Sequence, residues 1–225
     1  MKPVVPRSWR ECARYYLTEL WVPVDRPCWL KFASEVECEV LHGLAVDYSF
    51  VRSISGHIGS PDDKGGYRKY KPLADMLNSH RSTLITRENV AEIIDREVEN
   101  MRSVYGKRLW SAISKAFWML KRHPVAIFDG YADKGLRKLG FKPGEKTYRQ
   151  YFDAWFAFFE QEETIQGLDD AIKWLAGLPE TQRLLEQRKM NLSELNSLWF
   201  RSRVADMKLC VYGGAPWLDE DEGCR

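Results

Sequence analysis

The amino-acid sequence predicts an all-α protein, a two-lobed helical bundle of about ten helices. Along most of the 225 residues, apolar side chains recur at steps of three and four, which is the period of an amphipathic helix. No series of short segments alternates apolar and polar residues as β-strands do. We expect a single domain, with one lobe from about residue 1 to 85 joined by the C-terminal helices, and a central lobe from about 86 to 150.

The N-terminal part predicts two helices followed by a loop. Ser8 can cap a first helix, and Pro23 and Pro27 are expected to end it. Its apolar face comprises Trp9, Cys12, Ala13, Tyr16, Leu17 and Leu20. A second helix is expected from residue 30 to 46. Residues 53–71 are rich in glycine and predict a loop, whose last residues, GGYRKYK, suit phosphates and exposed bases or form an ordinary mobile connection.

The central part predicts three consecutive helices. Thr86 begins the first, and the second follows from Arg108 to about Arg122, where Pro124 ends it. This second helix has an apolar stripe facing the core and another stripe that carries Ser111, Lys115, Trp118 and Arg122. After the apolar residues 125–128, Asp129 is expected to cap a third helix that Gly140 closes.

The C-terminal part continues the helical pattern. An aromatic segment after residue 146 predicts a buried helix, and residues 168–178, 180–189 and 193–213 predict further helices with breaks at Pro179 and Asn191. The last seven residues, DEDEGCR, form an acidic tail.

Composition indicates a globular cytoplasmic protein. The chain is 44% hydrophobic and 29% charged, and no apolar run approaches the length that spans a membrane. The N-terminal residues lack the apolar centre of a secretory signal. The five cysteines and four histidines show no spacing typical of a disulfide framework or a zinc site, so we expect no metal. No organic cofactor is expected either.

Positive charge is concentrated around the central helices. Residues 101–150 contain twelve Lys or Arg and three Asp or Glu, a net charge of +9, whereas the whole chain carries +2. Such a basic block predicts binding to a phosphate backbone. A solvated, solubilising helix face is the alternative.

The order SAISK, helix, apolar turn, Asp129, helix resembles the 8-oxoguanine DNA glycosylase branch of the helix-hairpin-helix glycosylases. It is also similar to bacterial defence-associated proteins of that fold, whose closing helix resembles RVADMKLCVYG, residues 203–213. In that family a lysine opens the helix after a hairpin and an aspartate caps a later helix; Lys115 and Asp129 match these positions. The sequence departs from the family at residues 111–114, which hold no glycine, and in the fourteen-residue interval from Lys115 to Asp129.

The resemblance implies a DNA glycosylase, with associated lyase activity, that removes an oxidised or modified base, in bacterial anti-phage defence. Lys115 would attack the sugar C1′ of an extruded nucleotide, and Asp129 would stabilise the charge that develops on the sugar. Duplex DNA is the expected partner, together with proteins of a defence operon and without a membrane. The residues expected to contact DNA are Lys107, Arg108, Ser111, Trp118, Arg122, His123 and Tyr131.

Other interpretations of the same residues remain open. Asp129 is equally typical of a plain N-cap, and a helical lysine is usually a solvated surface residue. The altered hairpin favours a catalytically inactive module that binds nucleic acid or a modified base in a defence system. A third interpretation is a helical scaffold whose basic block binds another protein.

Overall fold

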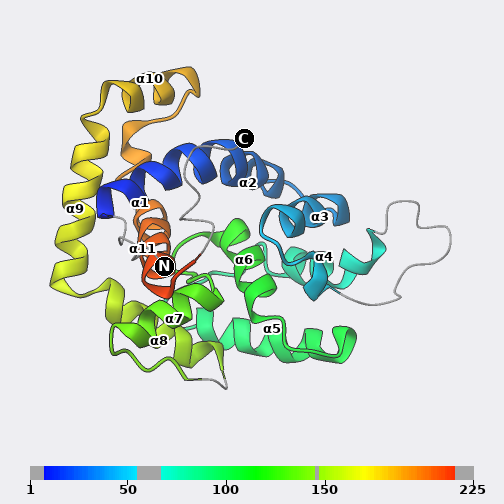
Figure 1. The fold of residues 1–225 in the computed structure, drawn as a ribbon. Coiled ribbons are helices and arrows are strands. Elements are labelled where there is room, and N and C mark those ends of the chain that lie inside the picture. Colours follow the sequence, from blue (N-terminus) through cyan, green and yellow to red (C-terminus); the bar gives the residue numbers. More distant parts are fainter. Residues whose placement is uncertain (1–7, 55–66, 145–146, 216–225) are drawn as a thin grey trace. The chain divides into compact units, whose positions relative to one another are not determined.

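The computed structural model describes residues 8–54, 67–144 and 147–215, and these residues contain helices and no β-strand (Figure 1). The all-α prediction is therefore confirmed. The chain divides into two compact units. The terminal unit comprises Met1–Leu20 and Asp129–Arg225, and the central unit comprises Trp21–Phe128. Most of the predicted glycine-rich loop, together with the acidic tail, lies outside the described residues.

The first helical segment is longer than predicted. Ser8 caps α1 (Trp9–Tyr15) through a reciprocal pair of hydrogen bonds with Glu11, as expected. The chain then continues as a π-helix, η1 (Tyr16–Asp25), and as α2 (Arg26–Phe32). The prediction that Pro23 and Pro27 end the helix was wrong. Pro27 lies in the first turn of α2, where a missing N–H removes no helical hydrogen bond, and Pro23 is accommodated within the π-helical segment.

The predicted helix at residues 30–46 is two helices. The chain leaves the helical conformation after α2, and α3 (Cys38–Asp47) begins six residues later. Val36 in the break is buried, and the side chain of Asn78 satisfies its backbone, accepting from the Val36 N–H at 2.8 Å and donating to its carbonyl at 3.0 Å. A side chain distant in sequence thus replaces the helical hydrogen bonds that periodicity predicted.

The rest of the central unit leads to the predicted site. Two short 3₁₀ turns, η2 (Val51–Ser53) and η3 (Arg68–Tyr70), flank the residues that are not described, and α4 (Lys71–Ser79) follows directly. Helix α5 (Val90–Tyr105) ends at Gly106, whose φ of 71° is the left-handed conformation that glycine adopts readily. Helix α6 (Trp110–Lys121) follows and packs on α2, α3, α4 and α5.

In the terminal unit, α7 (Gly130–Lys138) and α11 (Leu198–Gly213) lie side by side (Figure 1). Between them in the chain come α8 (Tyr148–Phe159), α9 (Glu162–Ala176), α10 (Pro179–Gln187) and the 3₁₀ turn η4 (Leu192–Glu194). Two glycines permit the close approach. A Cβ on Gly135 would overlap the Leu209 carbonyl oxygen, and one on Gly213 would overlap the Tyr131 carbonyl oxygen.

The two units differ in their bounds from the expected lobes. The first residues of the chain and the C-terminal helices belong to one unit. Residues 21–85, however, belong with 86–128, and residues 129–150 belong with the C-terminal helices. Among the described helices, none combines the length and the apolar character that crossing a membrane requires.

Candidate functional site

Helix α6 is buried on nearly all sides, which the amphipathic pattern did not predict. Every residue from Ala112 to Met119 is buried, including Ser114, Lys115 and Trp118. Four helices of the central unit pack against α6, so both of its predicted stripes face protein. Trp118 is only 1% exposed, and its ring is part of the core of the described protein, not a surface for stacking a base.

Lys115 lies in the second turn of α6, not at its start as in the family that the sequence resembles. The side chain is 8% exposed, whereas lysines are usually solvated. Its Nζ lies 3.4 Å from the carbonyl oxygen of Tyr48 and 5.6 Å from the centre of the Tyr48 ring. A buried amine in such surroundings is a candidate functional group.

The residue before Lys115 connects α6 to the residue before Asp129. The Phe128 N–H donates to Ser114 Oγ at 2.9 Å, and the Ser114 hydroxyl donates to the Ser111 carbonyl at 3.3 Å. The Phe128 ring also packs against the ring of Trp110, with 5.8 Å between the centroids. These contacts fix the end of the apolar segment 125–128 to the beginning of α6.

The turn between α5 and α6 carries the predicted cations Lys107 and Arg108. Lys107 is exposed. Arg108 donates to Glu99 at 2.6 Å, and its guanidinium lies 5.7 Å from the centre of the Trp110 ring. Arg108 therefore already has a carboxylate partner at the surface, where an ion pair contributes little to stability.

Arg122 and His123 follow α6 directly. Arg122 has a φ of 55°, so the chain leaves the helical conformation at this residue. The Arg122 guanidinium lies 3.8 Å from the centre of the Trp29 ring and 5.0 Å from the centre of the Trp21 ring. Burial, together with the positive charge of Arg87, lowers the pKa of His123. At neutral pH His123 is therefore mostly uncharged. The charge of Arg122 lies against the faces of two aromatic rings, an attractive arrangement.

Asp129 caps α7 as predicted. Its Oδ1 accepts the Tyr131 N–H at 2.8 Å, and the Cys210 Sγ lies 3.9 Å from the same oxygen. Tyr131 is half-buried, and Lys134 Nζ lies 5.1 Å from the centre of its ring. The close packing of α7 on α11 brings Asp129 to Cys210.

Helix α11 carries three buried charged residues that sequence reasoning missed: Arg203, Asp206 and Lys208. Asp206 accepts from Arg203 Nη1 at 2.8 Å and from Trp155 Nε1 at 2.6 Å. Burial, with a smaller contribution from Asp129, raises the pKa of Asp206 to about 6, although Arg203 and Trp155 act in the opposite direction. The i, i+3 spacing of Arg203 and Asp206 was the sequence signal for this pair.

Lys208 lies on another side of α11, with its Nζ 4.8 Å from the centre of the Tyr212 ring and 5.7 Å from that of Trp9. Burial lowers the pKa of Lys208, against the opposing charges of Cys12 and Glu11. Lys208 is thus a second buried amine, in the terminal unit, that the sequence pattern did not single out.

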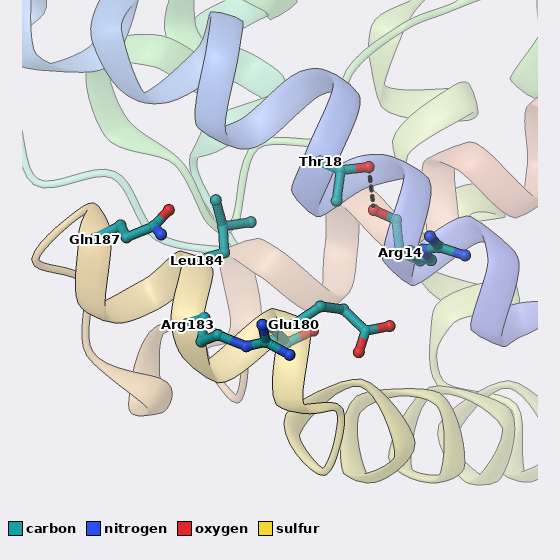
Figure 2. Close-up of a pocket in the computed structure, with 7 residues that line it drawn as sticks. Arg14, Thr18, Glu180, Arg183, Leu184 and Gln187 are labelled. Carbon is teal, nitrogen blue, oxygen red and sulfur yellow. Dashed lines mark hydrogen bonds between the residues drawn. The ribbon is translucent and has the colours of Figure 1, made fainter.

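A surface groove of about 410 Å³ lies between the first helical segment and α10 (Figure 2). Its lining comprises Arg14, Thr18, Glu180, Thr181, Arg183, Leu184 and Gln187. None of the residues predicted from the sequence to act in catalysis or DNA binding lines this groove.

Lys115 belongs to the central unit and Asp129 to the terminal unit. The structure therefore establishes the surroundings of each residue separately, and their action as a pair stays a prediction. Comparison of the chain with protein-family models, with curated proteins and with solved structures finds no match.

Proposed function

We propose that this protein is a DNA glycosylase with associated lyase activity, in which Lys115 is the nucleophile and Asp129 the assisting carboxylate. The supporting observation is the hydrogen bond from the Phe128 N–H to Ser114 Oγ. Phe128 immediately precedes Asp129, and Ser114 immediately precedes Lys115. The bond therefore joins the backbone N–H of the residue next to Asp129 to the side-chain hydroxyl of the residue next to Lys115.

Each residue has the properties that its role requires. Only the neutral form of an amine has a lone pair that can attack C1′, and Lys115 supplies a buried amine. Asp129 accepts a backbone N–H at the start of α7, which orients its carboxyl group. A carboxylate beside the sugar stabilises the oxocarbenium-like charge as the glycosidic bond breaks.

In the proposed reaction the Lys115 nitrogen forms a bond to C1′, and the base leaves with the electrons of the glycosidic bond and takes up a proton. Asp129 accepts the proton that the attacking amine loses. Opening of the sugar ring then gives a Schiff base between Lys115 and C1′, from which strand cleavage can follow. The basic block of residues 101–150 would hold the flanking phosphates.

The test uses duplexes that each contain one modified base. The purified protein is incubated with each duplex, released bases are identified by mass spectrometry, and borohydride is added to trap a Schiff base. We expect one or more duplexes to give a trapped complex with the wild type and none with Lys115→Gln. Asp129→Asn should slow base release and leave DNA binding unchanged.

Lys208→Gln is the matched control, because Lys208 is also a buried lysine but lies in the terminal unit. Trapping that survives Lys208→Gln and is lost in Lys115→Gln supports the assignment of the nucleophile. The reverse result would assign the chemistry to Lys208 and contradict the proposal.

The second candidate function is a binding module that recognises nucleic acid or a modified base in a defence system without cutting. The observation that favours it is the enclosure of Lys115, which is only 8% exposed and contacts Tyr48. A wild-type protein that binds duplex DNA, with an affinity that falls steeply with salt, and that releases no base would support this function.

A further inference from the structure

Tyr48 contacts the buried amine of Lys115, and the backbone of Tyr48 is held in place. It forms the C-cap of α3, and its N–H donates to the Leu44 carbonyl at 2.9 Å. Its own carbonyl faces Lys115 Nζ at 3.4 Å. The amine therefore meets a backbone oxygen whose position is determined by the end of α3.

The other end of Tyr48 is held by Asp25. The Tyr48 hydroxyl donates to Asp25 Oδ1 at 2.6 Å, a short distance that is typical of a hydrogen bond to a charged acceptor. Asp25 is completely buried at the junction of η1 and α2. Burial, together with the negative charges of Asp25 and Asp47, raises the pKa of the nearby Cys28 thiol to about 12. The backbone of Tyr48 is held at the end of α3 and its hydroxyl is held by Asp25, so the ring is fixed between α3 and the start of α2.

The geometry at Lys115 is suited to a nucleophile. A hydrogen bond to the Tyr48 carbonyl uses an N–H of the amine and leaves its lone pair for another atom. The aromatic face, 5.6 Å from Nζ, limits the directions in which the side chain can turn. Since catalytic groups must be held close to their reacting geometry, residues that fix the amine contribute to rate without touching substrate.

We propose that Tyr48 is a positioning residue for Lys115 and that Asp25 anchors Tyr48 by accepting its phenolic hydrogen. This inference rests on the proposed function, because positioning matters only if Lys115 reacts. It assigns a role to two residues far from Lys115 in sequence, one at the end of α3 and one before α2.

The first test measures position without substrate. Protein containing ¹³C-labelled lysine is observed by NMR, and the Lys115 signal is assigned by its loss in Lys115→Arg. The Tyr48 ring current should shift the Lys115 Cε protons upfield. We expect this shift to disappear in Tyr48→Leu, to decrease in Tyr48→Phe and Asp25→Ala, and to persist in Asp25→Asn, whose amide oxygen still accepts the phenolic hydrogen.

The second test measures reactivity with a duplex that the wild type cleaves. At saturating DNA, Tyr48→Phe and Asp25→Ala should slow borohydride trapping by about ten- to a hundredfold, the range expected when a reacting group is misplaced. DNA affinity should not change, and Asp25→Asn should recover most of the rate. Tyr48→Phe keeps the ring and so remains informative if Asp25→Ala does not fold.

An upfield shift that is unchanged in both Tyr48→Phe and Asp25→Ala would overturn the anchoring role of Asp25. Full trapping rates in these variants would overturn the positioning role. A wild-type protein that traps no substrate would overturn the proposed function instead. The ring-current measurement would then still decide whether Asp25 holds Tyr48 against Lys115.

Discussion

Helices α6 and α11 are both buried, in different units, yet they hold their buried cations in different ways. In α11, Arg203 donates to Asp206, which lies one turn along the same helix and also accepts from Trp155. In α6, Lys115 contacts a carbonyl oxygen and an aromatic ring of Tyr48, 67 residues away in the sequence. We interpret the first arrangement as structural, because the charges of the pair compensate each other, and the second as functional.

The largest effect is expected at Asp206. Asp206→Leu removes the carboxylate and leaves the Arg203 guanidinium buried, so it should lower the free energy of unfolding by about 3–5 kcal/mol, as loss of one partner of a buried pair does. Unfolding in urea at pH 7 measures this change. Asp206→Asn should lose less, because its amide oxygen can still accept from Trp155.

A double variant separates the charge from the packing. Arg203→Met combined with Asp206→Leu replaces both members of the pair by apolar groups, which is often nearly neutral. The double variant should therefore be more stable than Asp206→Leu alone. If both variants are equally destabilised, the buried Arg203 charge does not cause the loss of stability in Asp206→Leu. The interpretation of the α11 pair as structural, in contrast to α6, would then be wrong.

The second prediction concerns the dependence of stability on pH. Burial raises the pKa of Asp206 from 3.8 to about 6, so the folded state binds this proton more tightly than the unfolded state. The resulting stabilisation is fully present below about pH 4 and is lost as the pH rises through about 6. Each pKa unit corresponds to about 1.4 kcal/mol, which gives a change of about 3 kcal/mol.

The measurement compares the wild type with Asp206→Asn between pH 4 and 7.5. Burial raises the pKa of Glu97, but hydrogen bonds from Asn100, His80 and Arg96 lower it more, so its pKa is lowered overall. The effect of Glu97 on stability has the opposite sign, is the same in both proteins and cancels in the difference. The wild type should lose stability relative to the variant as the pH rises. A difference that is constant over this range would show that Asp206 titrates normally.

The third prediction tests the close packing that brings Asp129 to α11. Gly135→Ala places a methyl group against the Leu209 carbonyl and should destabilise the protein by about 1–3 kcal/mol, as overpacking does. Gly130→Ala is the control in the same helix, since a Cβ there meets nothing within 4 Å. Thermal unfolding should show a lower transition temperature for the Gly135 variant only. A Gly135→Ala variant as stable as Gly130→Ala would show that contact with α11 does not exclude a methyl group at residue 135.

Sequence periodicity predicted where most helices lie but not how deeply each one is buried. The prediction of Asp129 as an N-cap was confirmed because capping depends on local backbone geometry. Local pattern was less informative in α6, where surrounding helices bury the second stripe as well as the first. The break at Val36 was missed because Asn78, 42 residues away, satisfies its backbone groups.

The spacing of residues in the sequence likewise did not predict which residues surround Lys115. Arg122 shares the second stripe of the helix with Lys115 in the sequence pattern, but its guanidinium lies against the rings of Trp29 and Trp21. The contacts of Tyr48 with Lys115 and with Asp25 join different helical segments, and only the structure shows them. Contacts between residues distant in sequence decide the chemistry of a buried group, and no local pattern encodes them.

The smallest effect is expected at Lys115 itself. Lys115→Met replaces the buried amine by an apolar side chain of similar length, which removes both the cost of burying the amine and its long hydrogen bond to the Tyr48 carbonyl. The free energy of unfolding should stay within about 1 kcal/mol of the wild type or increase, as at sites where stability is given up for activity. Lys121→Met is the matched control in α6, because Lys121 Nζ donates to the Arg81 carbonyl at 2.5 Å and to the Thr83 carbonyl at 2.8 Å. The free energy of unfolding of Lys121→Met should fall, by no more than about 1.5–3 kcal/mol for each of these charged hydrogen bonds. If urea unfolding instead shows that Lys115→Met is destabilised as strongly as Asp206→Leu, the amine holds the fold together, and the functional interpretation of α6 fails.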